Sequence, residues 1–244
     1  NHRGDRRKLA IVSQSFRCGP TLQFDDADLF EAKATELGHI NPSLEFWLKE
    51  NASSFDNALV IGAGFGLSSK QLLDAGAEVT SFEPAQSRFD LLEINCAGGD
   101  NYKKAAGKLA GEEILYCWSD NQSQAVVGKT MGNNTQTIDV VTVDSLDLSL
   151  DLLLVYANGK ELDVLDGAAA TMAANPNMKI VIGWKPDTIE NIEDAVSKLE
   201  AYGKTVSIIH WEPEGDTISL KEQFTGAHHN DSLKAVYKAE LLLE

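Results

Sequence analysis

From residue 58 onward, short runs of apolar residues alternate with longer stretches in which apolar positions recur every three or four residues. The short runs predict buried strands and the longer stretches predict amphipathic helices, because the two elements bury residues with different periods. Apolar strands separated by such helices predict an α/β fold with a mostly parallel sheet covered on both faces. The expected strands are 58–63, 78–82, 112–119, 138–146, 152–157 and 179–184, and the expected helices are 66–76, 85–97, 161–174 and 188–203.

The last forty residues follow a different pattern. Residues 204–220 predict two strands around a Pro-Glu-Gly-Asp turn, and therefore an antiparallel hairpin near the C-terminal end. Residues 233–244 predict a helix or a strand that docks back on the domain. Their apolar face also leads us to expect a homodimer.

The first part of the chain lacks a clean strand pattern. Residues 25–37 and 41–55 predict two helices, the second with Asn41 as its N-terminal cap and a proline in the first turn. No linker or internal repeat divides the rest of the chain. We therefore expect residues 1–56 to form a helical extension packed on a main domain of residues 57–244.

Charge narrows the range of partners. The 244 residues include 37 acids and 21 bases, which gives a formal net charge of −16. Tight binding to nucleic acid depends on lysine and arginine that neutralise phosphates, so nucleic acid and anionic membranes are disfavoured as partners. Small or neutral substrates fit this composition better.

Cysteine and histidine positions give no sign of a metal site. Cys18, Cys96 and Cys117 are widely spaced and odd in number, and the pair His228-His229 has no third ligand at a recognisable spacing. We therefore predict no metal and no disulfide framework. No apolar run approaches the roughly 20 residues that span a bilayer, and the N-terminal "LAIV" is too short for a signal-peptide core. The expected location is the cytoplasm.

A glycine-rich turn follows the first strong strand. Gly62, Gly64 and Gly66 end the run "ALVIG" and open the next helix, where free backbone amides can face a ligand. Glycine permits the positive φ angles and the close backbone approach that such a turn requires. Glu83 ends the next strand, where a carboxylate can accept hydrogen bonds from ribose hydroxyls.

The spacing of the glycines distinguishes between two candidate cofactors, NAD(P) and S-adenosylmethionine. Dinucleotide sites follow Gly-x-Gly-x-x-Gly/Ala, whereas here the sixth position is Leu67, which disfavours NAD(P). The observed Gly-x-Gly-x-Gly resembles the loop of S-adenosylmethionine-dependent methyltransferases. A tight strand–helix turn beside a surface glutamate, with no ligand, is the alternative interpretation.

Three motifs together resemble the FkbM-type methyltransferase family. They read "LVIGAGFG", "VTSFEP" and "DLLLVYANGKELDVLDGA", and the similarity covers roughly residues 57–185. The closing "EGDTISLKEQF" (214–224) is similar to the C-terminal hairpin of that family. The resemblance implies a Rossmann-like class I methyltransferase fold with a C-terminal antiparallel hairpin. It also implies S-adenosylmethionine as cofactor and a hydroxyl on a small molecule or glycan as methyl acceptor. The implied cofactor contacts are Gly62, Ala63, Gly64, Gly66, Glu83 and Gly107.

The sequence departs from the family at its acidic positions. Val60 stands where an acid usually precedes the first glycine, and Tyr156 and Asn158 stand where an aspartate and a glutamate are usual. The resemblance places Tyr156 and Asn158 at the acceptor as the catalytic candidates. Because neither is an ordinary carboxylate base, a second hypothesis is a non-catalytic member that binds a nucleoside-like ligand or a protein partner.

Overall fold

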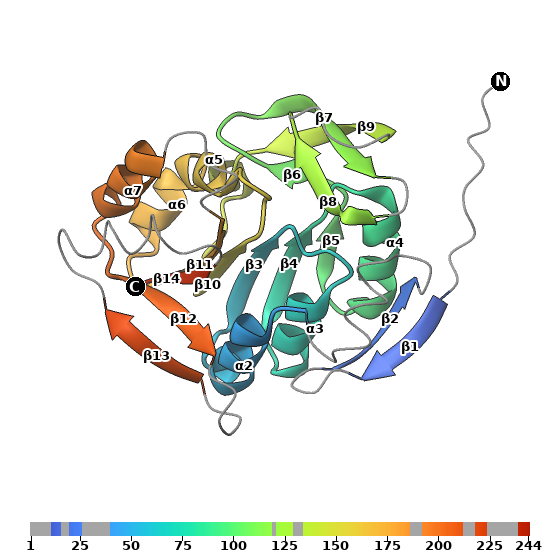
Figure 1. The fold of residues 1–244 in the computed structure, drawn as a ribbon, viewed down its shortest axis with the longest axis horizontal. Helices are drawn as coiled ribbons and strands as arrows, with labels where there is room; N and C mark the ends of the chain where they lie inside the picture. Colours follow the sequence, from blue (N-terminus) through green and yellow to red (C-terminus); the bar gives the residue numbers. More distant parts are fainter. Residues whose placement is uncertain are drawn as a thin grey trace.

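The computed structural model describes residues 11–15, 20–25, 40–118, 121–128, 134–185, 192–211, 218–223 and 239–244. An eight-stranded sheet lies at its centre, in the order β13-β12-β14-β11-β10-β3-β4-β5 (Figure 1). The five strands from β11 to β5 run parallel, and the other three join them in antiparallel fashion. Their bounds are β3 (Asn57–Ile61), β4 (Glu78–Phe82), β5 (Asp100–Tyr102), β10 (Leu152–Val155), β11 (Lys179–Trp184), β12 (Val206–Trp211), β13 (Ile218–Gln223) and β14 (Ala239–Leu243).

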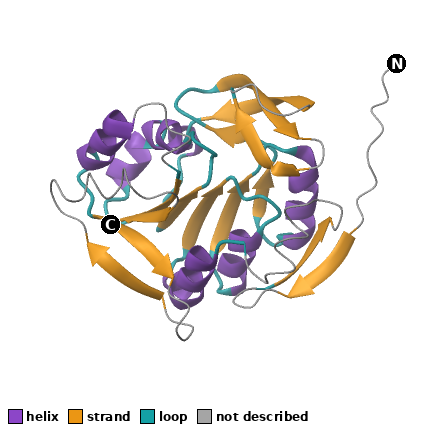
Figure 2. Cartoon of the chain, viewed as in Figure 1, coloured by secondary structure: helices purple, strands orange, loops and turns teal. Residues whose placement is uncertain are grey.

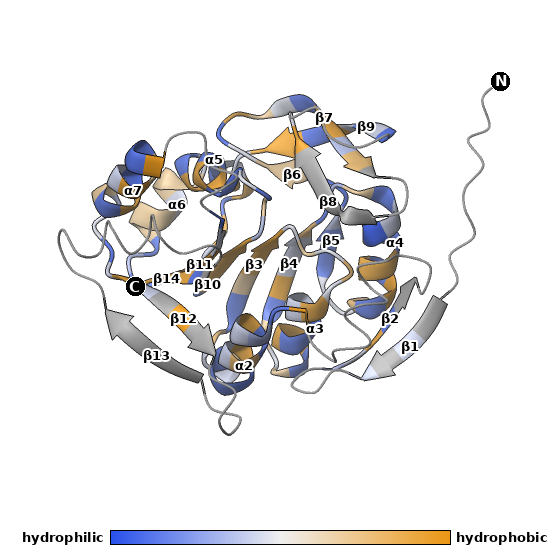
Figure 3. Cartoon of the chain, viewed as in Figure 1, coloured by the Kyte–Doolittle hydropathy of each residue, from blue (hydrophilic) through white to orange (hydrophobic). Residues whose placement is uncertain are grey.

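Helices cover both faces of this sheet, which confirms the predicted α/β architecture (Figure 2). Successive residues of β3 point to opposite faces, so Leu59 belongs to one buried cluster and Val60 to the other. Helices α2 and α3 pack in the Val60 cluster, and α5 and α7 pack in the Leu59 cluster. Figure 3 shows apolar residues gathered on the central strands. The helices are α2 (Pro42–Asn51), α3 (Leu67–Asp74), α4 (Gln86–Asn95), α5 (Glu161–Asp166), α6 (Ala169–Ala174) and α7 (Ile192–Ala201).

The strand order reverses between β3 and β10. From β3 the sheet continues to β4 and β5 on one side, and β10 continues to β11 on the other. Such a reversal leaves a crevice outside the carboxyl ends of the two strands, where ligands bind in open α/β sheets. Gly62 follows β3 and Tyr156 follows β10, and the Tyr156 backbone N–H donates to the Ile61 carbonyl at 2.8 Å. The two candidate segments therefore meet at this crevice.

A second sheet stands beside the crevice. It contains β6 (Ala105–Ala106), β7 (Gly111–Trp118), β8 (Asn121–Val127) and β9 (Asn134–Val141), in the order β6-β9-β7-β8. The strand predicted at 112–119 is present as β7. The strand predicted at 138–146 is present only as far as Val141, because the Thr142 side chain accepts from the Ser145 backbone N–H and Val143–Leu146 form a 3₁₀ turn. Both strands lie outside the main sheet. The segment between them, predicted as a polar loop, contains β8. This strand is not predicted from the sequence because β8 lies at the sheet edge and pairs with β7 alone. An edge strand can be held by backbone hydrogen bonds and does not need a long apolar run.

The prediction of a purely helical N-terminal extension is wrong for residues 11–15 and 21–25. Strands β1 (Ile11–Ser15) and β2 (Thr21–Asp25) form an antiparallel hairpin. Leu22 of β2 is 1% exposed and packs with Phe65 and Leu91. The Asn95 side chain bonds to both backbone groups of Gln23 at 2.7 Å. These strands are not predicted because an alternation of apolar and polar residues over only five positions is too short to be distinguished from a helical pattern.

The second N-terminal helix is confirmed. Helix α2 begins at Pro42, and the Asn41 side chain accepts a hydrogen bond from the Leu44 backbone N–H at 3.5 Å. A short 3₁₀ turn, Ala52–Ser54, follows the helix. Apart from Asp25, which ends β2, the helix expected at 25–37 lies outside the described residues.

The C-terminal hairpin is confirmed, and the last segment is a strand. Strands β12 and β13 pair in antiparallel fashion, while the turn predicted between them lies outside the described residues. Strand β14 inserts between β11 and β12. Its leucines at 241–243 are at most 1% exposed. They fill the core of this chain, so the homodimer, which stays a prediction, needs another surface.

One predicted helix is broken by a glycine. Residues 161–174 form α5 and α6 in place of a single helix, with Gly167 and Ala168 between them. A methyl group built on Gly167 would lie 2.1 Å from the carbonyl oxygen of Gly107. The glycine in the Gly-Ala pair of the third motif is therefore required by close backbone packing against the segment that carries Gly107.

We expect Gly167→Ala to destabilise the protein by about 2–3 kcal/mol, because two backbone segments must separate to admit the methyl group. The midpoint of urea unfolding measures this loss. Gly98→Ala is the matched control, since a methyl group there meets no atom within 4 Å, and it should stay within about 0.5 kcal/mol of the wild type. Equal midpoints for the two variants would contradict the packing argument.

Candidate functional site

A cavity of about 690 Å³ opens at the crevice between β3 and β10. This volume is typical of sites for small molecules and cofactors. Its walls come from segments far apart in sequence, namely residues 40–45 at the start of α2, the glycine loop 60–68, Glu83–Pro84 after β4, the second sheet, residues 156–163 after β10, and Gly183 and Lys185. The structure thus brings together most of the residues that the sequence singles out.

The glycine loop wraps one side of the cavity. Gly62 has φ +76°, and a methyl group on it would lie 2.0 Å from the Tyr156 carbonyl oxygen. Gly64 has φ +59° and faces open space, with no atom within 4 Å of a built methyl group. Ala63 also lines the cavity. Gly66 does not line it, because Gly66 lies at the start of α3 and packs against the Cys96 sulfur. Gly62 therefore serves the fold, and Gly64 leaves room for a ligand.

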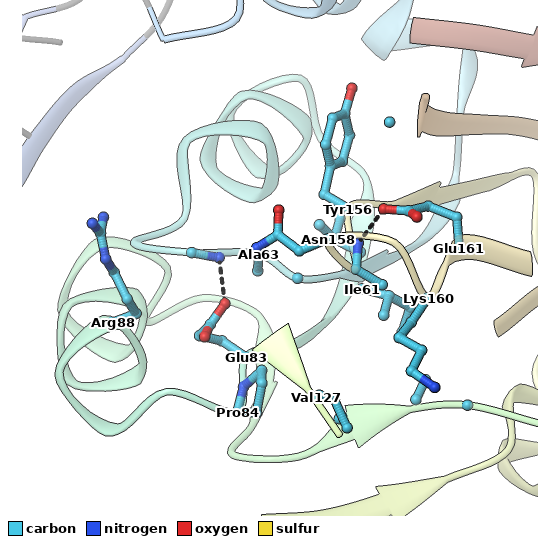
Figure 4. Close-up of a pocket in the computed structure, with 18 of the residues that line it drawn as sticks. Ile61, Ala63, Glu83, Pro84, Arg88, Val127, Tyr156, Asn158, Lys160 and Glu161 are labelled. Atoms are coloured by element: carbon cyan, nitrogen blue, oxygen red, sulfur yellow. Dashed lines mark hydrogen bonds between the residues drawn. The ribbon is translucent and has the colours of Figure 1, made fainter. Parts of the chain in front are cut away.

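Glu83 is fixed at the edge of this loop. One carboxylate oxygen accepts from the Gly64 backbone N–H at 2.9 Å and the other from the Ala85 N–H at 2.8 Å (Figure 4). The side chain is 7% exposed, and burial raises its pKa, while the Ala85 and Gly64 amides and the nearby Arg88 act in the opposite direction. A carboxylate has about four lone-pair sites. Two directions therefore stay available for ligand hydroxyls.

Apolar side chains form the end of the cavity nearest the second sheet. Ala105, Leu115, Val127 and Val140 line it, and they cluster with Ala85, two residues beyond Glu83. Gly107 also lines the cavity, and its backbone N–H donates to the Val141 carbonyl at 2.9 Å, while its contact with a cofactor stays a prediction. This end of the cavity suits a flat, apolar ring.

Tyr156 and Asn158 line the opposite wall. The Tyr156 hydroxyl accepts from the Asn41 side-chain amide at 3.3 Å, and its ring lies against Gly183. Burial, followed by the charge of Glu240, raises the Tyr156 pKa well above its ordinary value. Asn158 has φ +49°, and its side-chain oxygen accepts from Lys185 at 3.3 Å. Both side chains can form hydrogen bonds, but Tyr156 resists loss of its proton.

Glu161 is a site residue that sequence reasoning missed. Its two oxygens accept from the Ala157 and Gly159 backbone N–H groups at 2.9 Å each, and the side chain is 8% exposed. Burial raises its pKa. Figure 4 shows its carboxylate directed at the turn that carries Asn158. The motif contains this glutamate, and its position in the first turn of a helix is the signal that could have identified it as a cap.

Helix α2 supplies two more polar groups that the sequence does not reveal. Asn41, predicted as a cap, also donates to the carboxylate of Glu240 at 2.8 Å, across 199 residues of sequence. Glu45 borders the cavity, and one of its oxygens accepts from the Ile40 and Asn41 N–H groups at 2.7 and 2.9 Å. The N-terminal extension is therefore part of the cavity wall.

Neither a metal centre nor a membrane span is found in the described part of the chain. Within those residues, no three side chains of histidine, cysteine, aspartate or glutamate form a group that could hold a metal ion. His228 and His229 lie outside the described residues. No helix in the described ranges has the length and apolarity to cross a bilayer.

Comparisons with known proteins give structural similarity without sequence similarity. No protein-family model matches the sequence, and no curated protein matches it. The structure is similar to the methyltransferase FkbM from Methylobacillus flagellatus KT, with a TM-score of 0.50 and 14% identity over 78% of this chain and 43% of that one. The chain therefore spans less than half the length of that protein.

Two further solved structures are similar over more of their length. A TehB-like SAM-dependent methyltransferase from Corynebacterium glutamicum has a TM-score of 0.48 and 12% identity, over 87% of this chain and 92% of that one. A SAM-dependent methyltransferase from Agrobacterium tumefaciens has a TM-score of 0.46 and 12% identity, over 98% of this chain and 71% of that one.

These comparisons bear on the fold. The reversal of the sheet between β3 and β10 and the cavity at that point agree with the likeness to the FkbM structure. The chain resembles S-adenosylmethionine-dependent methyltransferases, and it has the Rossmann-like α/β fold of their class I.

Proposed function

We propose that this protein binds S-adenosylmethionine and transfers a methyl group to a hydroxyl on a small molecule or glycan. The observation that carries the proposal is the cavity at the strand reversal, with the open Gly64 backbone and the fixed Glu83 carboxylate on its wall. The likeness of the fold to a methyltransferase supports it.

The residues of the wall fit the chemical parts of this cofactor. The apolar end formed by Ala105, Leu115, Val127 and Val140 suits a purine ring. Next to it, Glu83 can accept hydrogen bonds from two ribose hydroxyls, and Gly64 permits close approach of the sugar. When bound, S-adenosylmethionine supplies a methyl group activated by a positively charged sulfur.

The acceptor is expected at the wall formed by Tyr156 and Asn158. Both side chains can donate hydrogen bonds to an acceptor oxygen, and Lys185 adds a positive charge beside Asn158. Alignment of reacting groups supplies much of the acceleration in bimolecular reactions, whereas a general base adds typically about 10²–10⁴-fold. We infer that this wall contributes chiefly by holding the acceptor in place.

A second candidate is ligand binding without catalysis. It is favoured by the neutral residues at positions 60, 156 and 158 and by the raised pKa of Tyr156, which keeps this phenol protonated, so that it does not take a proton from an acceptor hydroxyl. In that case the cavity would hold a nucleoside-like ligand, or its occupancy would control a protein partner.

Calorimetric titration distinguishes these functions. We expect S-adenosylmethionine and S-adenosylhomocysteine to bind and NAD not to bind, and mass spectrometry of a hydroxylated acceptor library to show methylated products. Binding of both sulfur compounds without any product would favour the non-catalytic candidate. Binding of NAD alone, or of none of the three, would overturn the proposal.

Acidification is expected to weaken binding of S-adenosylhomocysteine through Glu83. Burial raises the Glu83 pKa above 4.5, and protonation removes acceptor sites that the ribose requires. Affinity should therefore be full at a pH well above this pKa and should fall as the pH decreases through it. Calorimetric titrations at successively lower pH, starting from neutral, measure the change. Glu83→Gln cannot ionise, so a similar decline in that variant would contradict the assignment.

A further inference from the structure

The start of helix α2 forms the part of the cavity that lies beyond the glycine loop. Asn41, Leu44 and Glu45 all line the cavity there. Leu44 packs in the same buried cluster as Val60, which lies two residues before Gly62. The side chain of Gln71 on α3 donates to the Glu45 carbonyl at 3.1 Å, which ties α2 to the helix that the glycine loop begins. Helix α2 therefore has a defined place relative to that loop.

The Glu45 carboxylate has a fixed position on this wall. Its side chain is 1% exposed, and one oxygen accepts from two consecutive backbone N–H groups, those of Ile40 and Asn41. These two bonds orient the carboxylate at the start of α2. Neighbouring Val60 is apolar and offers no charge of its own.

The other parts of the cavity determine which end of a ligand would reach this wall. Figure 4 shows Val127, Pro84 and Glu83 on one side of Ala63 and the Tyr156 ring on the other. A nucleoside with its base at the apolar end and its sugar at Glu83 must extend its remaining substituent past Ala63. That direction leads to the wall where Ala63 and Tyr156 pack against the cluster that includes Leu44.

We propose that Glu45 binds the ammonium group at the amino-acid end of the cofactor. This assignment rests on the proposed function and adds a role for the N-terminal extension, which supplies a charge that position 60 lacks. A hydrogen bond from a charged donor to a buried carboxylate is short and strong, and Glu45 is fixed before the ligand arrives. Glu45 is thus a determinant of binding that distinguishes a complete cofactor from a bare nucleoside.

Two ligands that differ at the amino-acid end test this assignment. S-Adenosylhomocysteine carries that end, and 5′-methylthioadenosine lacks it. We expect Glu45→Gln to weaken binding of S-adenosylhomocysteine by about 10-fold or more and to change binding of 5′-methylthioadenosine less than about 2-fold. The glutamine retains an oxygen that can accept from the Ile40 and Asn41 amides, so the charge is the main change. Calorimetric titration of both ligands gives the readout without any catalytic step.

Comparison variants separate this assignment from the others. Glu83→Gln should weaken both ligands, because both contain the ribose. Unchanged affinities in Glu45→Gln would overturn the assignment, and so would equal losses of affinity for both ligands in that variant. The assignment would also be overturned if only Glu161→Gln showed a selective loss of affinity for S-adenosylhomocysteine. If the wild type binds neither ligand, the proposed cofactor fails as well, so the two failures are distinguishable. Thermal unfolding without ligand shows that each variant is folded, and retained binding of 5′-methylthioadenosine supports this for Glu45→Gln.

Discussion

Replacement of Glu83 by alanine is expected to weaken binding of S-adenosylhomocysteine by about 100-fold or more. The carboxylate is the proposed acceptor for two ribose hydroxyls, and each hydrogen bond to a charged group is worth about 1.5–3 kcal/mol. The same substitution removes the acceptor for the Gly64 and Ala85 backbone amides, which loosens the loop that faces the ligand. Calorimetric titration measures the loss of affinity.

Glu93→Ala is the matched control for this experiment. Glu93 lies on α4 with an exposed side chain, so its removal should leave the affinity unchanged. Thermal unfolding without ligand separates a lost contact from a lost fold. A folded Glu83→Ala variant with wild-type affinity would place the sugar elsewhere, even if the ligand still binds.

Gly62→Ala is expected to destabilise the protein by about 3 kcal/mol or more. The added methyl group would lie 2.0 Å from the Tyr156 carbonyl oxygen, and the φ of +76° is unfavourable for alanine. The clash would also separate β3 from β10, which are joined just there by the bond between the Tyr156 N–H and the Ile61 carbonyl. Urea unfolding measures the change.

Gly64→Ala provides the comparison for Gly62→Ala. Its φ is also positive, but a methyl group there meets no atom within 4 Å, so we expect a loss of stability of about 1–2 kcal/mol. Because Gly64 lines the cavity, the methyl group should weaken binding of S-adenosylhomocysteine although the protein stays folded. If Gly62→Ala were as stable as Gly64→Ala, the close contact with Tyr156 would be contradicted.

The parts of the fold that the sequence predicts are those in which local pattern and burial coincide. Strands β3, β10 and β11 are short, mostly apolar runs buried on both faces, so their positions follow from the local sequence pattern. The glycine loop and Glu83 are readable because backbone geometry requires particular residues at fixed offsets from a strand end.

The parts that escape prediction depend on contacts between distant segments. The requirement for glycine at position 167 comes from the Gly107 backbone, sixty residues earlier in the chain. Asn41 reads as an ordinary helix cap, and its bond to Glu240 exists only because β14 enters the sheet beside β11. Glu45 reads as an ordinary acidic residue in a first helical turn. No local pattern reports that a side chain faces a cavity whose other walls come from segments far away in the sequence.

The position of β14 also orders the assembly of the sheet. Strand β12 joins the sheet through β14, and β13 joins it through β12. These strands cannot join the parallel part of the sheet until residues 239–243 have paired with β11. Pairing between segments far apart in sequence requires costly loop closure and is slow. During refolding, the β12–β13 end should therefore acquire protection from hydrogen exchange after the parallel strands.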